Sequence, residues 1–445
     1  MQIKMVKETP MEFIKKASPK RGHTSRQLSA RVQSILDDIA THGEKAARAY
    51  AQQFDNWTAE IVLSKEKKAE LLSQVPADIK KDIVFVHEQV SNFAAAQKAS
   101  ISSFEYESFP GVKLGQRIIP IDCAGCYVPG GRYAHIASAI MSIATAKVAG
   151  VSTIIACSPP RGYSIDPIVA YTMDLAGADI ILEMGGVQAI ASMVHGLFTG
   201  HKANIIVGPG NAYVSEAKRL LFGPVGIDVL AGPTESAIIA DQTADPLTIV
   251  IDLLSQAEHG PDSPVWLFTD DRKLANRVHS LMPKIIDQMP NREVLRQAWT
   301  DHGVILLCEN REAVAKVSDD YAPEHLQVIA EDLNWWKARL KNYGSLFLGE
   351  GSTVTHGDKA SGTNHILPTE KAAMYSGGLS VHKFLKVVTT QEISPAANRT
   401  FSAVASRISR MEGMEAHALA CDWRLRKFFP DEEWDFPVHR FEDFA

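Results

Sequence analysis

The first hundred residues carry apolar side chains at helical spacing. In the stretch 25–54 they recur every three or four positions, at Leu28, Val32, Ile35, Leu36 and Ile39. This spacing places them on one face of an α-helix, and Gly43 is expected to interrupt it because glycine is unfavourable within a helix. Two further helical patterns span 65–74 and 76–100. We therefore predict a helical N-terminal region that includes an arm of residues 1–24.

From about residue 110 the pattern changes to short apolar runs that alternate with helical segments. The first set of apolar runs spans 116–121, 153–157, 180–182, 204–207 and 236–240. The helical segments between them span 136–149, 167–176, 188–198 and 211–222. A second set of apolar runs spans 265–269, 304–307, 326–329 and 345–348. Strands that alternate with helices at this spacing predict βαβ units and parallel sheets.

These patterns predict an α/β protein with two incomplete Rossmann-like modules that contain parallel sheets, a helical N-terminal arm and a small helical C-terminal domain. The expected boundaries are 1–24 for the arm, 25–110 with 236–378 for one module, 111–235 for the other module, and 379–445 for the C-terminal domain. A chain of 445 residues is too long for one compact core, and roughly two to four domains are typical of this length.

Charge and cysteine content argue against several classes of protein. The net charge is −6, with both signs mixed along the chain, whereas nucleic acids and membrane surfaces select basic patches. Five cysteines, an odd number, make a disulfide framework improbable. Cys123 and Cys126 form a single C-x-x-C with no second pair, so we expect small buried residues near a turn. Without a signal peptide or an apolar run of about 20 residues, we expect a cytoplasmic protein.

Glycine clusters occur at three predicted strand ends. They are Gly130-Gly131, Gly185-Gly186 and Gly208-Pro209-Gly210-Asn211, each followed by a predicted helix. Parallel sheets bind ligands at the carboxyl ends of their strands, and the free N–H groups at a helix N-terminus suit phosphate. No G-x-G-x-x-G is present, and one such loop alone would be an ordinary turn. Three in one module suggest a nucleotide site of unusual design.

Three segments concentrate groups that bind metals or transfer protons. Gln256 and His259 are three residues apart on a predicted helix, so they share a face; the pair is either two metal ligands or a polar helix end. Glu324 and His325 follow Pro323 in a loop before a strand, and they are either two bases or a solvated pair. The segment 356–365 crowds His356, Asp358, Asn364 and His365 into one loop.

Together these segments resemble the histidinol dehydrogenase family over most of the chain. Eight ordered blocks carry the resemblance: Tyr127-Val-Pro-Gly-Gly, Ala146-Lys-Val-Ala-Gly-Val, Gly185-Gly-Val-Gln-Ala-Ile, Gly208-Pro-Gly-Asn, Gln256-Ala-Glu-His, Ala322-Pro-Glu-His-Leu, Ser361-Gly-Thr-Asn-His and Glu412-Gly-Met-Glu-Ala-His. The last block ends at His417, which by itself would be read as a structural histidine on a helix. Eight blocks in order are far more specific than any one of them.

The resemblance implies a cofactor set and a site. It implies one Zn²⁺ per subunit bound by Gln256, His259, Asp358 and His417, with His417 supplied by the partner subunit of a homodimer. It implies Glu324 and His325 as bases, and NAD contacts from Tyr127, Gln188 and Asn211. The implied substrate contacts are Thr234, Gln256, His259, His325, Asp358, His365, Glu412 and His417. Residues 111–235 would then bind NAD, 25–110 with 236–378 would carry the metal and the bases, and 379–445 would form the dimer.

Some residues depart from the biosynthetic pattern of the family. Thr234 stands where that pattern has serine, and the segments 132–147 and 377–386 are more similar to a paralogous branch. This branch includes the sulfopropanediol dehydrogenases, which oxidise 2,3-dihydroxypropane-1-sulfonate to sulfolactate. Arg132, His135 and His382 are cationic or donor groups that suit an anionic substrate, whereas Glu412 suits the amine of histidinol.

The resemblance therefore implies a four-electron oxidation of a primary alcohol to a carboxylate through a bound aldehyde, with two NAD. The substrate is a small polar alcohol, either the sulfonated diol or L-histidinol. Two other classes stay open on the residues alone. A zinc hydrolase also pairs a metal with a glutamate base but needs no glycine loops at three strand ends, and a metal-storage protein needs no Glu324-His325 pair.

Overall fold

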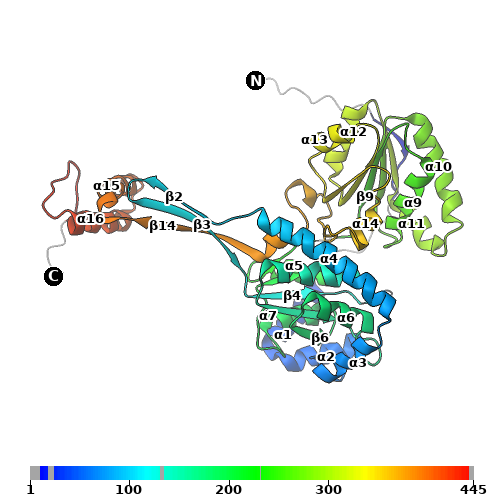
Figure 1. The fold of residues 1–445 in the computed structure, drawn as a ribbon, viewed down its shortest axis with the longest axis horizontal. Coiled ribbons are helices and arrows are strands. Elements are labelled where there is room, and N and C mark those ends of the chain that lie inside the picture. Colours follow the sequence, from blue (N-terminus) through cyan, green and yellow to red (C-terminus); the bar gives the residue numbers. More distant parts are fainter. Residues whose placement is uncertain (1–10, 19–24, 131–134, 231, 440–445) are drawn as a thin grey trace. The chain divides into compact units, whose positions relative to one another are not determined.

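A computed structural model describes residues 11–18, 25–130, 135–230 and 232–439 (Figure 1). The chain forms two compact units. The first unit comprises residues 1–98 and 120–384, and the second comprises residues 99–119 and 385–445. Both predicted parallel sheets lie in the first unit, so the α/β class is confirmed.

One sheet of the first unit has five parallel strands. In spatial order they are β6 (Ile180–Glu183), β5 (Thr153–Ser158), β4 (Cys123–Tyr127), β7 (Ile205–Val207) and β8 (Gly226–Ile227). The helices that join them are α5 (Ile136–Ala149), α6 (Pro167–Ala176), α7 (Gly186–His195) and α8 (Ala212–Leu221). Each predicted helix in this region is confirmed to within two or three residues. Cys123 and Cys126 lie buried within β4 and are free thiols.

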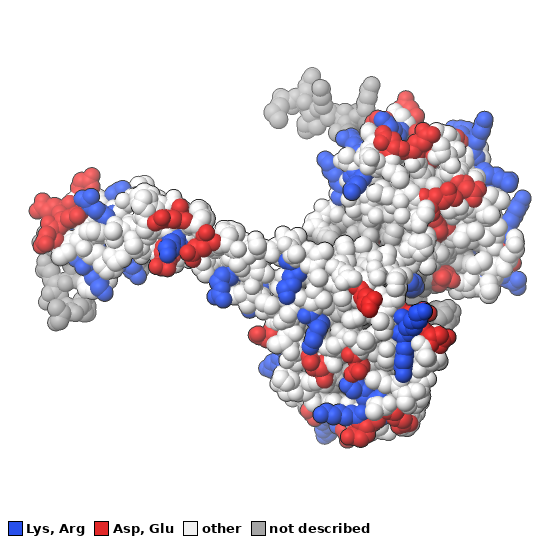
Figure 2. All heavy atoms as spheres, in the orientation of Figure 1, with Lys and Arg blue, Asp and Glu red and all other residues white. Residues whose placement is uncertain are grey.

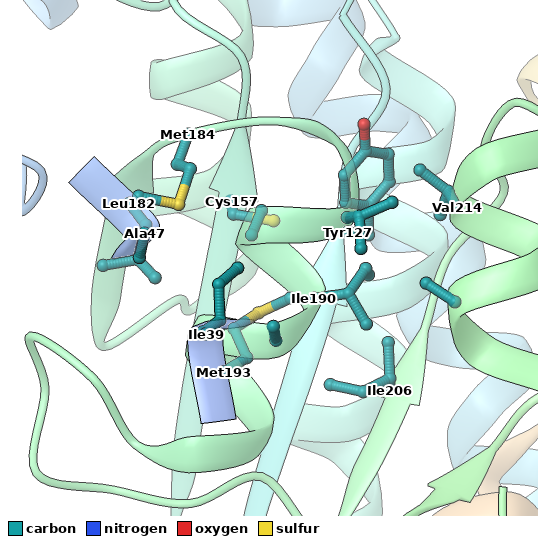
Figure 3. Packing of buried hydrophobic residues seen from close by; sticks show 14 of the residues in the cluster. Ile39, Ala47, Tyr127, Cys157, Leu182, Met184, Ile190, Met193, Ile206 and Val214 are labelled. Carbon is teal, nitrogen blue, oxygen red and sulfur yellow. The ribbon is translucent and has the colours of Figure 1, made fainter. Parts of the chain in front are cut away.

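Two N-terminal helices cover one face of this five-stranded sheet. The apolar faces of α1 (Ser25–His42) and α2 (Glu44–Asp55) pack on α7 and α8. Ile39 and Ala47 belong to the same buried cluster as Ile190 of α7 (Figure 3). This packing differs from the expected boundary, which grouped residues 25–110 with 236–378. An amphipathic pattern shows that a helix face is buried, but it does not show which sheet covers that face.

The remaining helices of this region belong to the first unit as well. Helix α3 (Lys65–Ser73) packs on α6, and it is followed by α4 (Ala77–Ala99). Near the N-terminus, β1 (Met11–Lys15) is a strand rather than part of a helical arm. It pairs antiparallel with a strand of the second sheet.

The second sheet has six strands, of which five are parallel. In spatial order they are β1, β11 (Val304–Cys308), β10 (Val265–Thr269), β9 (Ser236–Ala240), β12 (His325–Ile329) and β13 (Ser345–Leu348). The five parallel strands are mostly apolar because both faces of the sheet are covered. Helices α9 (Pro246–Ala257), α10 (Arg272–Ile286) and α11 (Arg292–His302) cover one face. Helices α12 (Arg311–Tyr321) and α13 (Leu333–Arg339) cover the other.

The five parallel strands of each sheet have the same connectivity. In both sheets the first strand lies in the centre, the next two lie on one side and the last two on the other. Such an order creates a switch point beside the central strand, where the loops at the carboxyl ends diverge. After β13 the chain forms α14 (Val354–Lys359) and two short 3₁₀ turns, Ala372–Met374 and Val381–Phe384.

The second unit combines a three-stranded sheet with two helices. Its sheet has the order β14 (Leu385–Ile393), β3 (Val112–Pro120), β2 (Phe104–Phe109), and α15 (Pro395–Met411) packs on α16 (Glu415–Phe428). The expectation of a small helical domain over 379–445 is wrong for β14, and the strand predicted at 116–121 belongs to this sheet rather than to the five-stranded one. β14 was missed because its partner in the sheet, β3, lies far earlier in the sequence, and no local pattern indicates a pairing over that distance.

On the face drawn in Figure 2, basic and acidic side chains are interspersed over the first unit. Among the described residues, no helix is both long enough and apolar enough to cross a membrane.

A buried ion pair fixes the glycine loop that follows β7. Lys218 of α8 pairs with Asp228 and also donates to the carbonyl oxygen of Gly208 over 3.0 Å. The N–H of Gly208 donates to Asp228 Oδ2 over 2.7 Å. Both charged side chains are almost wholly buried. The pair therefore holds both polar groups of the Gly208 backbone.

We predict that Lys218→Ala lowers the free energy of unfolding by about 3–5 kcal/mol, because it leaves the Asp228 carboxylate buried without a counter-charge. The matched control is Arg219→Ala, which removes the neighbouring exposed pair with Glu216 and should cost about 0–1 kcal/mol. Denaturant titration of the purified variants measures both. Equal losses in the two variants would contradict this account.

Candidate active site

Two carboxylates and a histidine meet at the amino ends of β9 and β12. The register pairs His325, the first residue of β12, with Ser236, the first residue of β9. The preceding residues, Glu324 and Glu235, are therefore neighbours. The N–H of Glu235 donates to Glu324 Oε2 over 2.9 Å, and the N–H of His325 donates to the carbonyl oxygen of Glu235 over 3.1 Å. All three residues are buried.

The His325 ring is oriented by contacts at both nitrogens. Its Nδ1 lies 3.1 Å from the carbonyl oxygen of Glu235. Because a carbonyl only accepts, this contact places the proton of the neutral ring on Nδ1. Nε2 lies 3.4 Å from Asp358 Oδ1. In the neutral ring, Nε2 is thus the nitrogen that can take up a proton.

The environment shifts the pKa of each of these groups. Burial raises the pKa of Glu324 to about 8 and that of Glu235 to about 7. Burial would lower the pKa of His325, but the carboxylates of Glu324 and Asp358 together raise it to about 9. Burial alone would raise the pKa of Asp358, but the contacts of its carboxylate with histidines hold that pKa well below the usual range. Strong mutual shifts among buried titratable groups are typical of functional sites.

Asp358 also connects this cluster to the predicted metal ligands. It lies in α14, and its Oδ2 accepts from Gln256 Nε2 over 3.2 Å. Gln256 is 2% exposed, and its Oε1 has no hydrogen-bond partner among the described residues. A buried carbonyl oxygen without a donor, beside a carboxylate, fits a metal cation.

His259 lies near Gln256 but not on the same helix. Helix α9 ends at Ala257, and the backbone N–H of His259 donates to the carbonyl oxygen of Gln256 over 3.2 Å in the turn that follows. The expectation that both residues share a helix face is therefore wrong. Within the described ranges, no group of three or more His, Cys, Asp or Glu side chains is arranged to hold a metal. Of the predicted ligands, the first unit supplies only His259 and Asp358 of these residue types.

A further buried carboxylate, which the sequence analysis did not single out, connects the elements that carry the site. Asp252 lies one helical turn before Gln256 on α9. Its Oδ2 accepts from Gln327 Nε2 over 2.8 Å, and its Oδ1 accepts from Thr353 Oγ1 over 2.9 Å. Gln327 lies two residues after His325, on the same face of β12. Thr353 precedes α14. Its side chain makes no capping bond to this helix, and its hydroxyl donates to Asp252. One carboxylate thereby fixes α9, β12 and α14 relative to one another.

The loop after α14 contacts the first turn of α5. His365 Nδ1 lies 3.1 Å from the carbonyl oxygen of Asp358, and its Nε2 lies 3.1 Å from Ser138 Oγ. Burial lowers the pKa of His365 to about 4, so the ring is neutral near pH 7. α5 starts at the carboxyl edge of the five-stranded sheet, so this contact joins that edge to the cluster. Thr234 is half-buried and precedes Glu235, at the same edge of the sheet as Glu324 and His325.

The predicted NAD-binding residues lie at the carboxyl ends of β4, β6 and β7. Tyr127 packs at the edge of the buried cluster with its hydroxyl directed away from the aliphatic side chains (Figure 3), and this hydroxyl accepts from the N–H of Gly186 over 3.1 Å. Gln188 is buried, and its Oε1 has no partner in the described part of the chain. Asn211 caps α8 through its side-chain oxygen. An unpartnered amide oxygen fits a donor such as a ribose hydroxyl, and the N-terminus of α7 beside it suits phosphate.

Asp55, at the end of α2, is a further member of this edge. Its Oδ2 accepts from the N–H of Gly185 and from Gln188 Nε2, each over 3.0 Å. Burial raises its pKa, and these two donors oppose the rise. Because Asp55 lies 130 residues before Gly185, no local motif indicated the contact.

The contacts described above do not extend to four of the predicted residues. Glu412 and His417 belong to the second unit, where both are exposed. His382 is exposed in the 3₁₀ turn Val381–Phe384. Arg132 lies outside the described residues.

Comparisons of the sequence and of the structure with known proteins point to the same family. The histidinol dehydrogenase family model matches residues 18–425. The chain is 53% identical over 432 residues, or 96% of its length, to a sulfopropanediol 3-dehydrogenase of Ruegeria pomeroyi, of which 99% is covered. It is 36% identical to a histidinol dehydrogenase of Gluconobacter oxydans, over 92% of this chain and 95% of that one. The crystal structure of the histidinol dehydrogenase of Elizabethkingia anophelis is 32% identical, with a TM-score of 0.86 over 92% of this chain and 94% of the other. The chain therefore belongs to the histidinol dehydrogenase family.

Proposed function

We propose that this protein is a zinc-dependent, NAD-linked dehydrogenase that oxidises the primary alcohol of (R)-2,3-dihydroxypropane-1-sulfonate to the carboxylate of sulfolactate. The observation that carries the reaction type is the buried Glu324–His325 pair beside Asp358 and Gln256. The 53% identity to a sulfopropanediol 3-dehydrogenase supports the substrate. The alternative substrate is L-histidinol, which is oxidised to L-histidine.

The proposed ligands suit the cofactors. Gln256, His259 and Asp358 would hold zinc together with His417 from a second copy, and Tyr127, Gln188 and Asn211 would contact NAD. When bound, zinc would supply Lewis-acid polarisation of the substrate hydroxyl, and NAD would supply the hydride acceptor.

The two bases have separate positions and separate tasks. In its neutral form, His325 Nε2 would take the hydroxyl proton while the carbinol carbon gave up a hydride, for which NAD would be the acceptor, to leave the aldehyde. Glu324 then accepts a proton from water as it adds to the aldehyde, and the hydrate loses a second hydride to give the carboxylate. His325 keeps its orientation through the Nδ1 contact with Glu235. Burial of both bases excludes bulk water from the aldehyde.

We also propose a homodimer with shared sites. Glu412 and His417 are exposed on the second unit, which also exposes large apolar side chains. These include Phe104, Tyr106, Ile408, Met411, Met414 and Trp423. Exposed apolar side chains of this number on a small unit are typical of an association surface. A second copy that covered them could bring His417 to the zinc ligands of the first.

A comparison of two substrates tests the proposed function. NADH formation from (R)-2,3-dihydroxypropane-1-sulfonate should reach two NADH per substrate and should stop when zinc is chelated. L-histidinol should be a poor substrate. Efficient turnover of L-histidinol alone would establish the alternative, and no NADH with either substrate would favour a zinc hydrolase.

We predict different losses for the two bases. His325→Ala should slow alcohol oxidation by roughly 10²–10⁴-fold, the usual contribution of a positioned base. Glu324→Gln should slow oxidation of the aldehyde more than oxidation of the alcohol. Single-turnover measurements started from the alcohol and from the aldehyde separate the two steps. Equal losses on both substrates in both variants would rule out this division of tasks.

We predict that inactive subunits complement one another. His259→Ala and His417→Ala should each inactivate the homodimer by removing one zinc ligand. A heterodimer of the two should regain activity, because one of its two sites keeps both native residues. Differently tagged subunits allow the heterodimer to be purified and assayed. An inactive heterodimer would show that each site is built within one chain.

A further inference from the structure

Two loops that touch at the carboxyl edge of the five-stranded sheet each carry a basic residue. Gly130 follows β4 and lies so close to Pro159, which follows β5, that an added Cβ would meet Pro159 Cγ at 2.1 Å. The β5 loop continues to Arg161, whose N–H donates to the carbonyl oxygen of Ser164 over 2.8 Å. The β4 loop ends at His135, the residue before α5. Arg161 is exposed and His135 is half-buried.

A third basic residue lies across the contact between α5 and the catalytic cluster. Ser138 of the first turn of α5 contacts His365, and His365 contacts the carbonyl oxygen of Asp358. Lys359 follows Asp358 as the last residue of α14, and it is exposed. His135 therefore lies on one side of this contact and Lys359 on the other.

The electrostatics show that these groups influence one another. Burial lowers the pKa of His135, and the positive charges of Lys359, His259 and Arg161 lower it further. The imidazole of His135 makes no capping bond to α5. Basic groups from three segments thus converge beside Asp358, where their mutual repulsion is unfavourable until an anion lies between them.

We propose that His135, Lys359 and Arg161 form a subsite that binds the sulfonate group, at the end of the substrate opposite the carbon that is oxidised. This inference rests on the proposed function and specifies which residues recognise the substrate. A sulfonate is a tetrahedral monoanion with three acceptor oxygens, so donors from several segments can each bind one oxygen. The same subsite repels the ammonium group of an amino alcohol. His382, the other donor expected here, lies in the 3₁₀ turn Val381–Phe384 and stays a prediction.

Lys359→Ala tests the subsite. The matched substrate is glycerol, which has a hydroxyl in place of the sulfonate. Loss of one charge-assisted hydrogen bond should lower kcat/KM for the sulfonated diol by about 10- to 100-fold, with most of the change in KM. The loss for glycerol should be less than about threefold, and KM for NAD should stay within about twofold. Lys359→Arg should restore most of the loss because it keeps the charge.

A control and a second readout keep the test decisive. Lys147→Ala removes a lysine from the other end of α5, where it pairs with Asp179, and should change neither ratio. Methanesulfonate should inhibit the wild type competitively, and Lys359→Ala should raise its inhibition constant by the same factor as KM. This readout applies even if glycerol is turned over too slowly to measure.

The outcomes separate this inference from the proposed function. If the wild type does not oxidise the sulfonated diol, the proposed function is wrong. If the wild type oxidises it but Lys359→Ala loses activity equally with glycerol, or methanesulfonate inhibition is unchanged, the subsite is elsewhere.

Discussion

The site depends on one buried carboxylate, that of Asp358. Its two oxygens contact Gln256 and His325, and its backbone carbonyl contacts His365. A buried charge is costly unless polar groups surround it, so these contacts must form together when the chain folds. Asp358 thereby collects the end of α9, the start of β12 and the loop after α14 at one point. Asp252 supports the same three elements through Gln327 and Thr353.

The two sheets of the first unit carry the predicted site residues at opposite ends of their strands. The five-stranded sheet presents the carboxyl ends of β4, β6 and β7, where Tyr127, Gln188 and Asn211 lie. The six-stranded sheet presents the amino ends of β9 and β12, where Glu235, Glu324 and His325 lie. The contact between Ser138 and His365 joins these two edges. A hydride acceptor held at the first edge would then lie near the bases at the second, although the two sheets share one connectivity.

Local patterns predicted most helices and strands of the first unit, because these elements carry apolar side chains on their buried sides. The span predicted for α5, 136–149, is the observed one. Contacts between distant segments were not predictable in this way. The pairing of Glu235 with Glu324 spans 89 residues, and that of Asp252 with Thr353 spans 101. A polar residue within an apolar run, such as Gln327 in β12, was the available signal. The family resemblance supplied the roles of Gln256 and Asp358, which spacing alone left open.

The central claim is that oxygen and nitrogen ligands around Asp358 hold the metal, and that no cysteine takes part. X-ray absorption at the zinc edge of the purified protein tests this directly. We expect a first shell of oxygen and nitrogen only, at about 2.0–2.2 Å, with the outer-shell scattering of imidazole. A sulfur shell at about 2.3 Å, or zinc that is lost on washing without loss of activity, would contradict the account.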